Sequence, residues 1–213
     1  MELQLKNIQE DIINWYNQKW DQSLNRYPWR IGDRSPYEIL IAEIILQHTT
    51  AKAITDNKCY TRFIERFPNI KSIKKINRKE LEDIFKPIGL YNQKTERILK
   101  LRDVLVKKFD GNVPNDKFEL LSLPGVGEYT ANAVLTFVYN HNEVPLDNNL
   151  KRIGLTAWNI KDRKTLLEFY KKLAKINPKM IYWALFDIGR FHCRKPVPNC
   201  KGCPLNNHCK KNQ

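Results

Sequence analysis

The sequence lacks any long apolar run and any recognisable targeting segment. None of its runs approaches the ~20 consecutive apolar residues that a membrane-spanning helix requires. Residues 1–17 carry acidic side chains at Glu2, Glu10 and Asp11 between apolar residues at helical spacing, and they contain no signal-peptide core. We therefore expect an intracellular protein that does not bind a membrane.

Acidic residues are scarce relative to basic ones. Lys and Arg number 37 against 23 Asp and Glu, which gives a formal net charge of +14. The segment from Cys193 to Gln213 contains five basic residues and no acidic residue. An excess this large favours a polyanionic partner such as a nucleic acid. The competing interpretation is a lysine-rich surface without a specific partner.

Signals for β-strands are also missing, because no segment alternates apolar and polar residues between hairpin turns. Apolar residues instead recur at helical spacing, and Pro or Gly separates the segments. We predict helices over residues 36–52, 53–67, 69–75, 78–86, 93–108, 117–121, 128–139, 150–158, 164–175 and 179–191. The predicted fold class is all-α. The segment 36–52 is apolar almost all round, so we expect it to be central.

A Pro-Gly-Val-Gly turn joins the predicted helices 117–121 and 128–139. Pro124 ends the first helix, while Gly125 and Gly127 permit a positive φ and a close approach of another backbone. The amides that begin the second helix would then face outward, where the helix dipole favours an anion. On a basic protein we expect this anion to be a DNA phosphate, bound by Gly125, Val126 and Gly127 without sequence readout. The alternative is an ordinary helical hairpin.

Cysteine is rare before residue 193 and concentrated after it. Only Cys59 precedes Cys193, Cys200, Cys203 and Cys209, which follow the pattern C-x6-C-x2-C-x5-C. In an intracellular chain this clustering favours a metal over disulfides, and four thiolates suit zinc or an iron–sulfur cluster. The single C-x2-C pair favours iron–sulfur, since structural zinc usually uses two such pairs. Cys59 is predicted to be a buried apolar residue.

The loop 194–199 lies between the first two cysteines of this pattern, and a metal would hold it rigid. We predict that Arg194 and Lys195 in this loop contact a phosphate. His192 and His208 are spare candidate ligands for the same metal.

Together these features resemble the helix-hairpin-helix DNA glycosylases, the superfamily of endonuclease III and the adenine-DNA glycosylases. The resemblance spans nearly the whole chain and is carried by LPGVGEYTANAV, VPLDNNLKRI and the four-cysteine segment, in the family's order and spacing. It implies a [4Fe–4S] cluster on the four cysteines and cleavage of the N-glycosidic bond of a nucleotide flipped out of double-stranded DNA. It also implies a DNA cleft between two helical domains. These are a six-helix barrel with the hairpin, residues 30–139, and a cluster-bearing domain, residues 1–29 and 140–213.

Two carboxylates are candidates for this chemistry. A carboxylate stabilises the positive charge that grows on the sugar, and it can orient or deprotonate the attacking water. Asp147 matches the family's catalytic aspartate, and its position also predicts a helix N-cap. Glu43 lies among aliphatic residues in EILIAEIILQHTT, so we expect it to be buried with a raised pKa. It would act as an acid or orient base and water, unless its side chain faces solvent.

Residue 129 distinguishes the branches of the family. The resemblance implies a Schiff-base lysine there in bifunctional members and a small hydroxyl residue in adenine glycosylases. Tyr129 resembles instead the thymine/uracil glycosylases of thermophilic archaea, as do YPWR, SPYEILIAEIILQHTTA and IGLYNQ. We therefore predict a monofunctional glycosylase without AP-lyase activity, which releases thymine or uracil mispaired with guanine. The end of the chain at Gln213, where adenine glycosylases carry a further domain, favours the same choice.

Three alternatives remain open. The chain could remove adenine opposite guanine or 8-oxoguanine, it could be a non-catalytic iron–sulfur module that binds DNA, and Tyr129 could serve packing alone. If the protein flips a base out of the duplex, as the resemblance implies, a side chain must fill the gap that the base leaves. Gln47 is the predicted plug or the contact to the estranged guanine, and His48 follows it with a plain helix-surface position as its alternative. Leu90, Tyr91 and Asn92 are the predicted wedge from the opposite side, although each of these could be ordinary loop packing. We expect a monomer in the cytoplasm, associated with the nucleoid.

Overall fold

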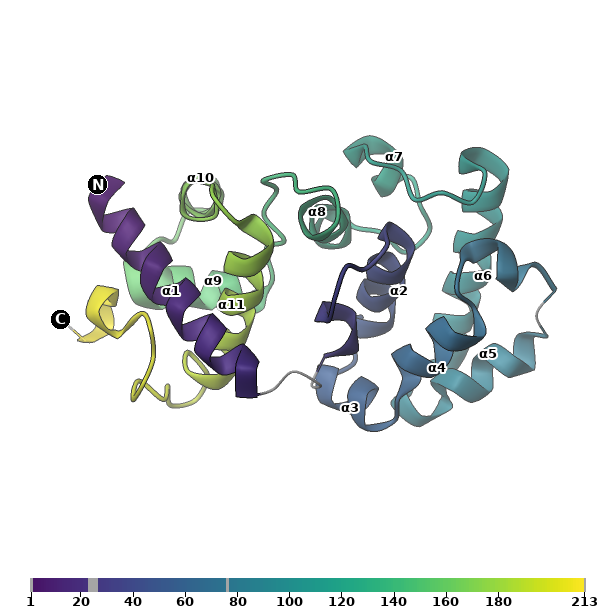
Figure 1. Cartoon of the computed structure of the whole chain (residues 1–213), viewed down its shortest axis with the longest axis horizontal. Coiled ribbons are helices and arrows are strands. Elements are labelled where there is room, and N and C mark those ends of the chain that lie inside the picture. The colour runs from purple at the N-terminus through teal and green to yellow at the C-terminus, as the bar shows by residue number, and fades with distance from the viewer. Residues whose placement is uncertain (1, 23–26, 76, 213) are drawn as a thin grey trace. The chain divides into compact units, whose positions relative to one another are not determined.

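The computed structural model describes residues 2–22, 27–75 and 77–212. Within these ranges the regular elements are all helices, which confirms the all-α prediction (Figure 1). None of the described helices is both long and apolar enough to cross a membrane. The elements in chain order, with 3-10 helices written η, are α1 (Glu2–Gln22), η1 (Pro28–Arg30), α2 (Pro36–Leu46), α3 (Ala51–Asp56), α4 (Cys59–Arg66), η2 (Ile70–Lys75), α5 (Arg78–Phe85), η3 (Lys86–Ile88), α6 (Tyr91–Phe109), α7 (Lys117–Leu121), α8 (Glu128–Phe137), α9 (Asn148–Trp158), α10 (Arg163–Leu173), α11 (Pro178–Phe191), η4 (Asn206–His208) and η5 (Lys210–Asn212).

The chain forms two compact units. Residues 24–139 form one, called here the central unit, and residues 1–23 with 140–213 form the other, called the terminal unit. The assignment of a barrel to residues 30–139 and of a cluster domain to residues 1–29 and 140–213 stays a prediction.

Helix α2 forms the core of the central unit. Ser35 begins it with a capping box, in which the Ser35 side chain accepts from the Glu38 amide and the Glu38 carboxylate accepts from the Ser35 amide. Residues 39–45 of α2 are all buried, and the helix packs against α8 and α4. The prediction of a central, nearly all-apolar helix is therefore confirmed.

The predicted end of this helix at residue 52 is wrong. α2 ends at Leu46, because His48 adopts a left-handed backbone with φ +57° and Thr50 caps a new helix, α3. The predicted helix 53–67 is likewise divided, since Lys58 has φ +52° between α3 and α4. The sequence carries no Gly or Pro at either break, and the capping Thr50 is a local signal of the first break that the prediction did not use. Cys59, at the start of α4, is fully buried as predicted.

The remaining predicted helices agree with α5 to α11 within two residues at each end, and segment 69–75 is the 3-10 helix η2. In the terminal unit, α11 packs against both α1 and α9. Tyr170 of α10 is fully buried and donates its hydroxyl to the Leu150 carbonyl of α9 at 2.6 Å. A side chain at Gly154 would overlap Leu166, so this glycine lets α9 and α10 approach closely.

Candidate active site and cysteine pocket

The hairpin of the central unit consists of α7, the turn 122–127 and α8. Gly125 has φ +80°, which confirms the expected positive φ, but the group that a Cβ would overlap is the side chain of Arg97 and not another backbone. The expectation for Gly127 is wrong, since its φ of −102° is accessible to any residue. Gly127 instead is the N-cap of α8, where the absence of a side chain leaves the amides of the first turn uncovered. Val126 is buried and its amide donates to the Leu123 carbonyl at 3.1 Å, so the predicted phosphate contact by the Val126 amide is wrong.

Gln47 is held against this turn. Its Nε2 donates to the Gly125 carbonyl at 2.9 Å and lies 3.4 Å from Thr130 Oγ1, while its Oε1 accepts from Arg97 Nη1. All the polar atoms of the Gln47 side chain are therefore engaged within the central unit. To fill a gap in DNA, Gln47 would have to exchange these bonds. His48, the next residue, is exposed.

The predicted wedge lies where α6 begins. Leu90 is the N-cap of α6 with φ +52°, and 45% of its surface is exposed, while Gly89 before it has φ +74°. Tyr91 is half-buried. A large apolar side chain held outward on a constrained turn is compatible with the predicted role.

Glu43 and Tyr129 both lie in the central unit. Glu43 is only 6% exposed on the buried helix α2, which confirms the predicted burial and rules out the solvent-facing alternative. Tyr129 is half-buried in the first turn of α8, beside the exposed Glu128.

Asp147 lies in the terminal unit as the N-cap of α9. Its Oδ1 accepts from the Leu150 amide at 2.8 Å, and its Oδ2 accepts from Asn149 Nδ2 at 2.7 Å. Burial raises the pKa of the Asp147 carboxyl above its ordinary value of 3.8, although these hydrogen bonds and the charge of Arg152 act in the opposite direction. The predicted cap is confirmed. The same carboxylate is fixed and partly withdrawn from water, as functional carboxylates often are.

A hydrogen-bond relay connects Asp147 to the first cysteine. Asn149, which donates to Asp147, accepts from Arg152 Nη2 at 2.6 Å. Arg152 also donates to the Gly189 carbonyl at 2.8 Å and, through Nε, to the Cys193 carbonyl. The sequence analysis did not identify Asn149 and Arg152. Both follow the predicted N-cap Asp147 within the first turns of the helix, and their spacing of three residues could have indicated that their side chains meet.

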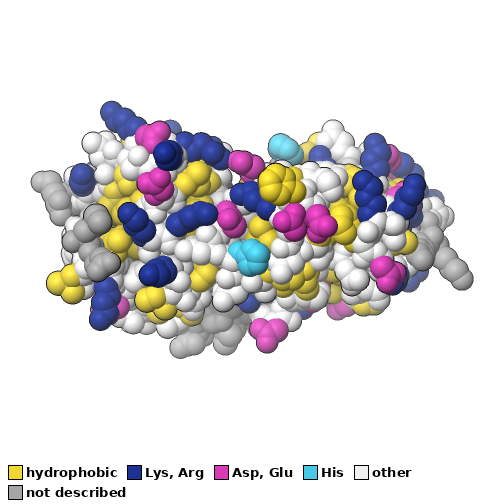
Figure 2. Space-filling view, turned by 90° about the horizontal axis from the view of Figure 1, so that it is seen from above, with side chains coloured by type: hydrophobic (Ala, Val, Ile, Leu, Met, Phe, Trp, Pro, Cys, Tyr) yellow, Lys and Arg dark blue, Asp and Glu magenta, His cyan; other side chains and the backbone are white. Residues whose placement is uncertain are grey.

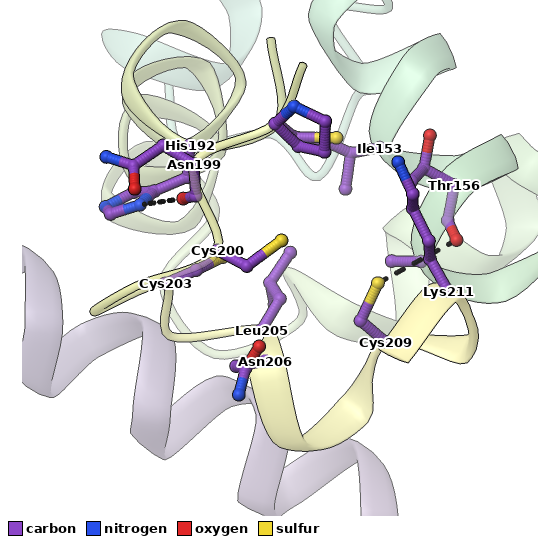
Figure 3. Close-up of a pocket in the computed structure, with 13 residues that line it drawn as sticks. Ile153, Thr156, His192, Asn199, Cys200, Cys203, Leu205, Asn206, Cys209 and Lys211 are labelled. Carbon is purple, nitrogen blue, oxygen red and sulfur yellow. Dashed lines mark hydrogen bonds between the residues drawn. The ribbon is translucent and has the colours of Figure 1, made fainter. Parts of the chain in front are cut away.

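The four cysteines Cys193, Cys200, Cys203 and Cys209 line one pocket, and each is half-buried and free of disulfides. Figure 3 shows the Cys200 and Cys209 sulfurs pointing into this pocket from the two sides. The rest of the wall includes the apolar side chains of Ile153, Ala157 and Leu205. Burial, and the proximity of the other cysteines, raise the pKa of Cys203 to about 11.

This donor set suits a cationic group that replaces the thiol protons and keeps four sulfur ligands together. In the part of the chain that the structure describes, no three Cys, His, Asp or Glu side chains are arranged so that they could hold a metal ion. Four cysteine thiolates are also the usual ligands of an iron–sulfur cluster, in which they would be shared among several irons rather than converge on one ion.

The loop between the first two cysteines is closed at its base by His192. The His192 carbonyl accepts from the Asn199 amide at 2.8 Å, and His192 Nδ1 donates to the Asn199 carbonyl at 2.8 Å (Figure 3). Arg194 and Lys195 are exposed on this loop. His208 Nε2 lies 2.8 Å from Asp11 Oδ2, whereas His192 Nε2 is buried without a hydrogen-bond partner among the described residues, so His192 stays a candidate ligand.

Basic side chains lie over both units on the face shown in Figure 2, with acidic side chains among them. The net charge of +14 is thus distributed over the surface as well as enriched after residue 193.

Comparison with known proteins finds similarity to DNA glycosylases in both sequence and structure. A family model described as "HhH-GPD superfamily base excision DNA repair protein" matches residues 41–179. The chain is 34% identical to an adenine DNA glycosylase of Buchnera aphidicola over 94% of its own length, and it spans 57% of the length of that relative. It is 32% identical to a thymine/uracil-DNA glycosylase of Pyrobaculum aerophilum, over 95% of this chain and 90% of the relative. Its structure matches a thermostable thymine-DNA glycosylase with a TM-score of 0.85 and 28% identity, over 98% of this chain and 96% of the other.

Proposed function

Because the chain belongs to the HhH-GPD superfamily of base excision DNA repair proteins, we propose that it is a monofunctional DNA glycosylase. Its proposed substrates are thymine and uracil mispaired with guanine in double-stranded DNA. The observation that carries the proposal is the carboxylate of Asp147, which two hydrogen bonds fix in place while burial raises its pKa. We further propose that the protein acts as a monomer at the nucleoid.

The proposed reaction is hydrolysis. The bond between C1′ and the base nitrogen breaks, and its electron pair leaves with the base, which takes up a proton. Positive charge grows on the sugar meanwhile, and the Asp147 carboxylate stabilises it. Water then forms the new bond to C1′ and gives up a proton, for which Asp147 is the proposed acceptor. Glu43 orients the base and the water or acts as the acid.

DNA binding is proposed to use backbone amides and exposed cations. The turn that ends at Gly127 leaves the first amides of α8 open, and the helix dipole favours a phosphate there. Arg194 and Lys195 add charge on a loop that His192 closes. Such contacts position the duplex without reading its sequence.

Tyr129 supports the monofunctional assignment. A tyrosine has no amine that could attack C1′ and form a Schiff base, so base release would not be coupled to strand cleavage. The high coverage and similar fold of two relatives named for thymine release favour the same substrate class.

Adenine release is the second candidate function. It is favoured by the adenine DNA glycosylase that is 34% identical over 94% of this chain, and by the buried Glu43, which could protonate a leaving adenine. Tyr129 disfavours it.

For the cysteine pocket we propose a [4Fe–4S] cluster held by Cys193, Cys200, Cys203 and Cys209. When bound, the cluster would supply structural cross-linking and positive charge for four thiolates, and it would take no part in bond cleavage. The chain's own contribution is the relay from the Cys193 carbonyl through Arg152 and Asn149 to Asp147. Iron and sulfide analysis with a visible absorption spectrum tests this; stoichiometric zinc in a colourless protein would contradict it.

The substrate is tested by single-turnover base release from duplexes with one T:G, U:G, A:G or A:8-oxoguanine pair, followed by alkaline cleavage of abasic sites. We expect release from T:G and U:G without strand breaks before alkali. Release of adenine alone would establish the second candidate. Tight duplex binding without release from any pair would instead indicate a non-catalytic binding module.

A further inference from the structure

Lys94 of α6 is a buried cation that the proposed chemistry does not use. It is 2% exposed, and its Nζ donates to the Ile45 carbonyl at 2.7 Å and to the Gln47 carbonyl at 2.8 Å. These carbonyls belong to the end of α2 and to the residue after it, where a helix leaves acceptors without intrahelical donors. Lys94 therefore caps α2 from a different helix and stabilises the break before His48.

Gln47 extends this contact to the hairpin. Its backbone carbonyl is held by Lys94, while its side chain donates to the Gly125 carbonyl at 2.9 Å and accepts from Arg97. The side chain of Arg97 lies against Gly125, where a Cβ would overlap it. Lys94 and Arg97 of α6 thus both hydrogen-bond to Gln47, which in turn hydrogen-bonds to the turn of the hairpin.

The predicted wedge lies at the start of the same helix. Leu90 is the N-cap of α6, and Lys94 and Arg97 follow within its first two turns, three residues apart on one side of the helix. The Lys94 amide donates to the Leu90 carbonyl at 3.0 Å in the first turn. The start of α6 therefore contacts the three segments of the central unit that carry the predicted DNA contacts: Gln47 with His48, Gly125 to Gly127, and Leu90 with Tyr91.

We propose that Lys94 is a positioning residue that fixes these three segments as one preformed surface for DNA, with Gln47 and Arg97 as the connection to the hairpin. The inference rests on the proposed function, because it assigns the three segments to duplex binding. Lys94 itself is too deeply buried to contact DNA, so its effect is transmitted through the carbonyl of Gln47. A fixed arrangement spares the ordering cost at the moment of binding, and its loss weakens affinity and slows release of the base.

The test compares variants of the full-length protein. Lys94→Met keeps the length and apolar stem of the side chain but removes the donor, and Lys94→Arg retains several donors. Lys100→Met is the matched control, because Lys100 is an exposed lysine six residues along the same helix and its loss changes the net charge equally. Gln47→Leu breaks the connection to Gly125 while leaving the backbone bonds to Lys94 intact.

Hydrogen exchange of the free protein gives the first measurement, which needs no DNA. In Lys94→Met we expect at least tenfold faster exchange in residues 47–50 and 124–127, with little change in α4 and α5. Gln47→Leu should accelerate exchange in 124–127 only. Unchanged exchange in Lys94→Met, or acceleration spread evenly over the central unit, would overturn the proposal.

Duplex binding and single-turnover base release give the second measurement. We expect Lys94→Met to bind a T:G duplex at least tenfold more weakly than the wild type, Lys100→Met to lose less than threefold, and Lys94→Arg to recover most of the affinity. Equal losses in Lys94→Met and Lys100→Met would refute the positioning role. If the wild type binds no duplex, the proposed function fails, while the exchange data still decide whether Lys94 couples the segments.

Discussion

The substitution Asp147→Asn separates a catalytic role from a structural one. Asparagine retains an oxygen that can accept from the Leu150 amide, so the cap of α9 survives. Its amide group would oppose the amide of Asn149, at a cost of about 1 kcal/mol for one lost hydrogen bond. Burial raises the pKa of the Asp147 carboxyl, which means that burial of the charged form costs free energy. The substitution removes that cost and so offsets the lost hydrogen bond. We therefore expect the stability of Asp147→Asn at pH 7 to lie within about 1 kcal/mol of the wild type.

The activity should change far more. Loss of a carboxylate that stabilises the sugar and accepts a proton from water typically lowers a rate by about 10²–10⁴-fold. The assay is single-turnover base release from a T:G duplex, together with urea unfolding of the same preparation. Asp147→Ala is the structural comparison, since it loses the cap and should be destabilised by about 1 kcal/mol or more.

Asp162→Asn is the matched control. Asp162 caps α10 in the same unit and accepts from the Thr165 amide at 2.7 Å, but it is exposed and its hydrogen bonds lower its pKa. We expect Asp162→Asn to lose stability at neutral pH and to keep full activity. The reasoning is refuted if Asp147→Asn retains base release within tenfold of the wild type.

The pH dependence has a defined sign for Asp147. Because its folded-state pKa is raised, its contribution to stability is fully present below pH 3.8 and is lost as the pH rises through the folded pKa. Wild type should therefore become less stable relative to Asp147→Asn over that interval. A relative stability that instead rises with pH would show that the carboxylate is stabilised by the fold.

Further predictions concern Lys94, Arg152 and Tyr129. Burial lowers the pKa of Lys94 from 10.5 to about 8, so the unfolded chain binds more protons than the folded protein between these pH values. The stability of the wild type relative to Lys94→Met should therefore rise from pH 8 to 10.5. Urea unfolding at several pH values measures this difference, and a difference that does not change with pH would show that the pKa of Lys94 is ordinary. Arg152→Met should lower the rate of base release about tenfold with unchanged metal content, because it cuts the relay to Asp147 and raises the barrier by about 1.4 kcal/mol. An unchanged rate would mean that Asn149 is positioned without Arg152. Tyr129→Lys should form a borohydride-trapped adduct with DNA that the wild type does not form, and an adduct with wild type would contradict monofunctional chemistry.

Much of the architecture follows from local signals. Helices α5 to α11 begin and end near Pro, Gly and capping residues, so their bounds could be predicted within two residues. The breaks at His48 and Lys58 could not, because neither carries Gly or Pro, and the bonds from Lys94 that hold the first break come from a distant part of the chain.

Some residues of the candidate site could be predicted from local sequence patterns and others could not. Asp147, Glu43 and the cysteines stand in recognisable local patterns, and the structure confirms the cap at Asp147 and the burial of Glu43. Lys94 and Arg97 could not be found from sequence, since a buried lysine looks like any other in a chain with 37 basic residues. The bonds of Gln47 with Gly125, Lys94 and Arg97 join segments far apart in the chain, which no local pattern brings together.

The most direct measurement is a structure of the protein bound to a duplex that carries a non-hydrolysable nucleotide opposite guanine. We expect the nucleotide to be rotated out of the helix, with the Asp147 carboxylate about 3 Å from a water placed to attack C1′. An extruded nucleotide bound elsewhere, with Asp147 still contacting only the start of α9, would contradict the proposed mechanism.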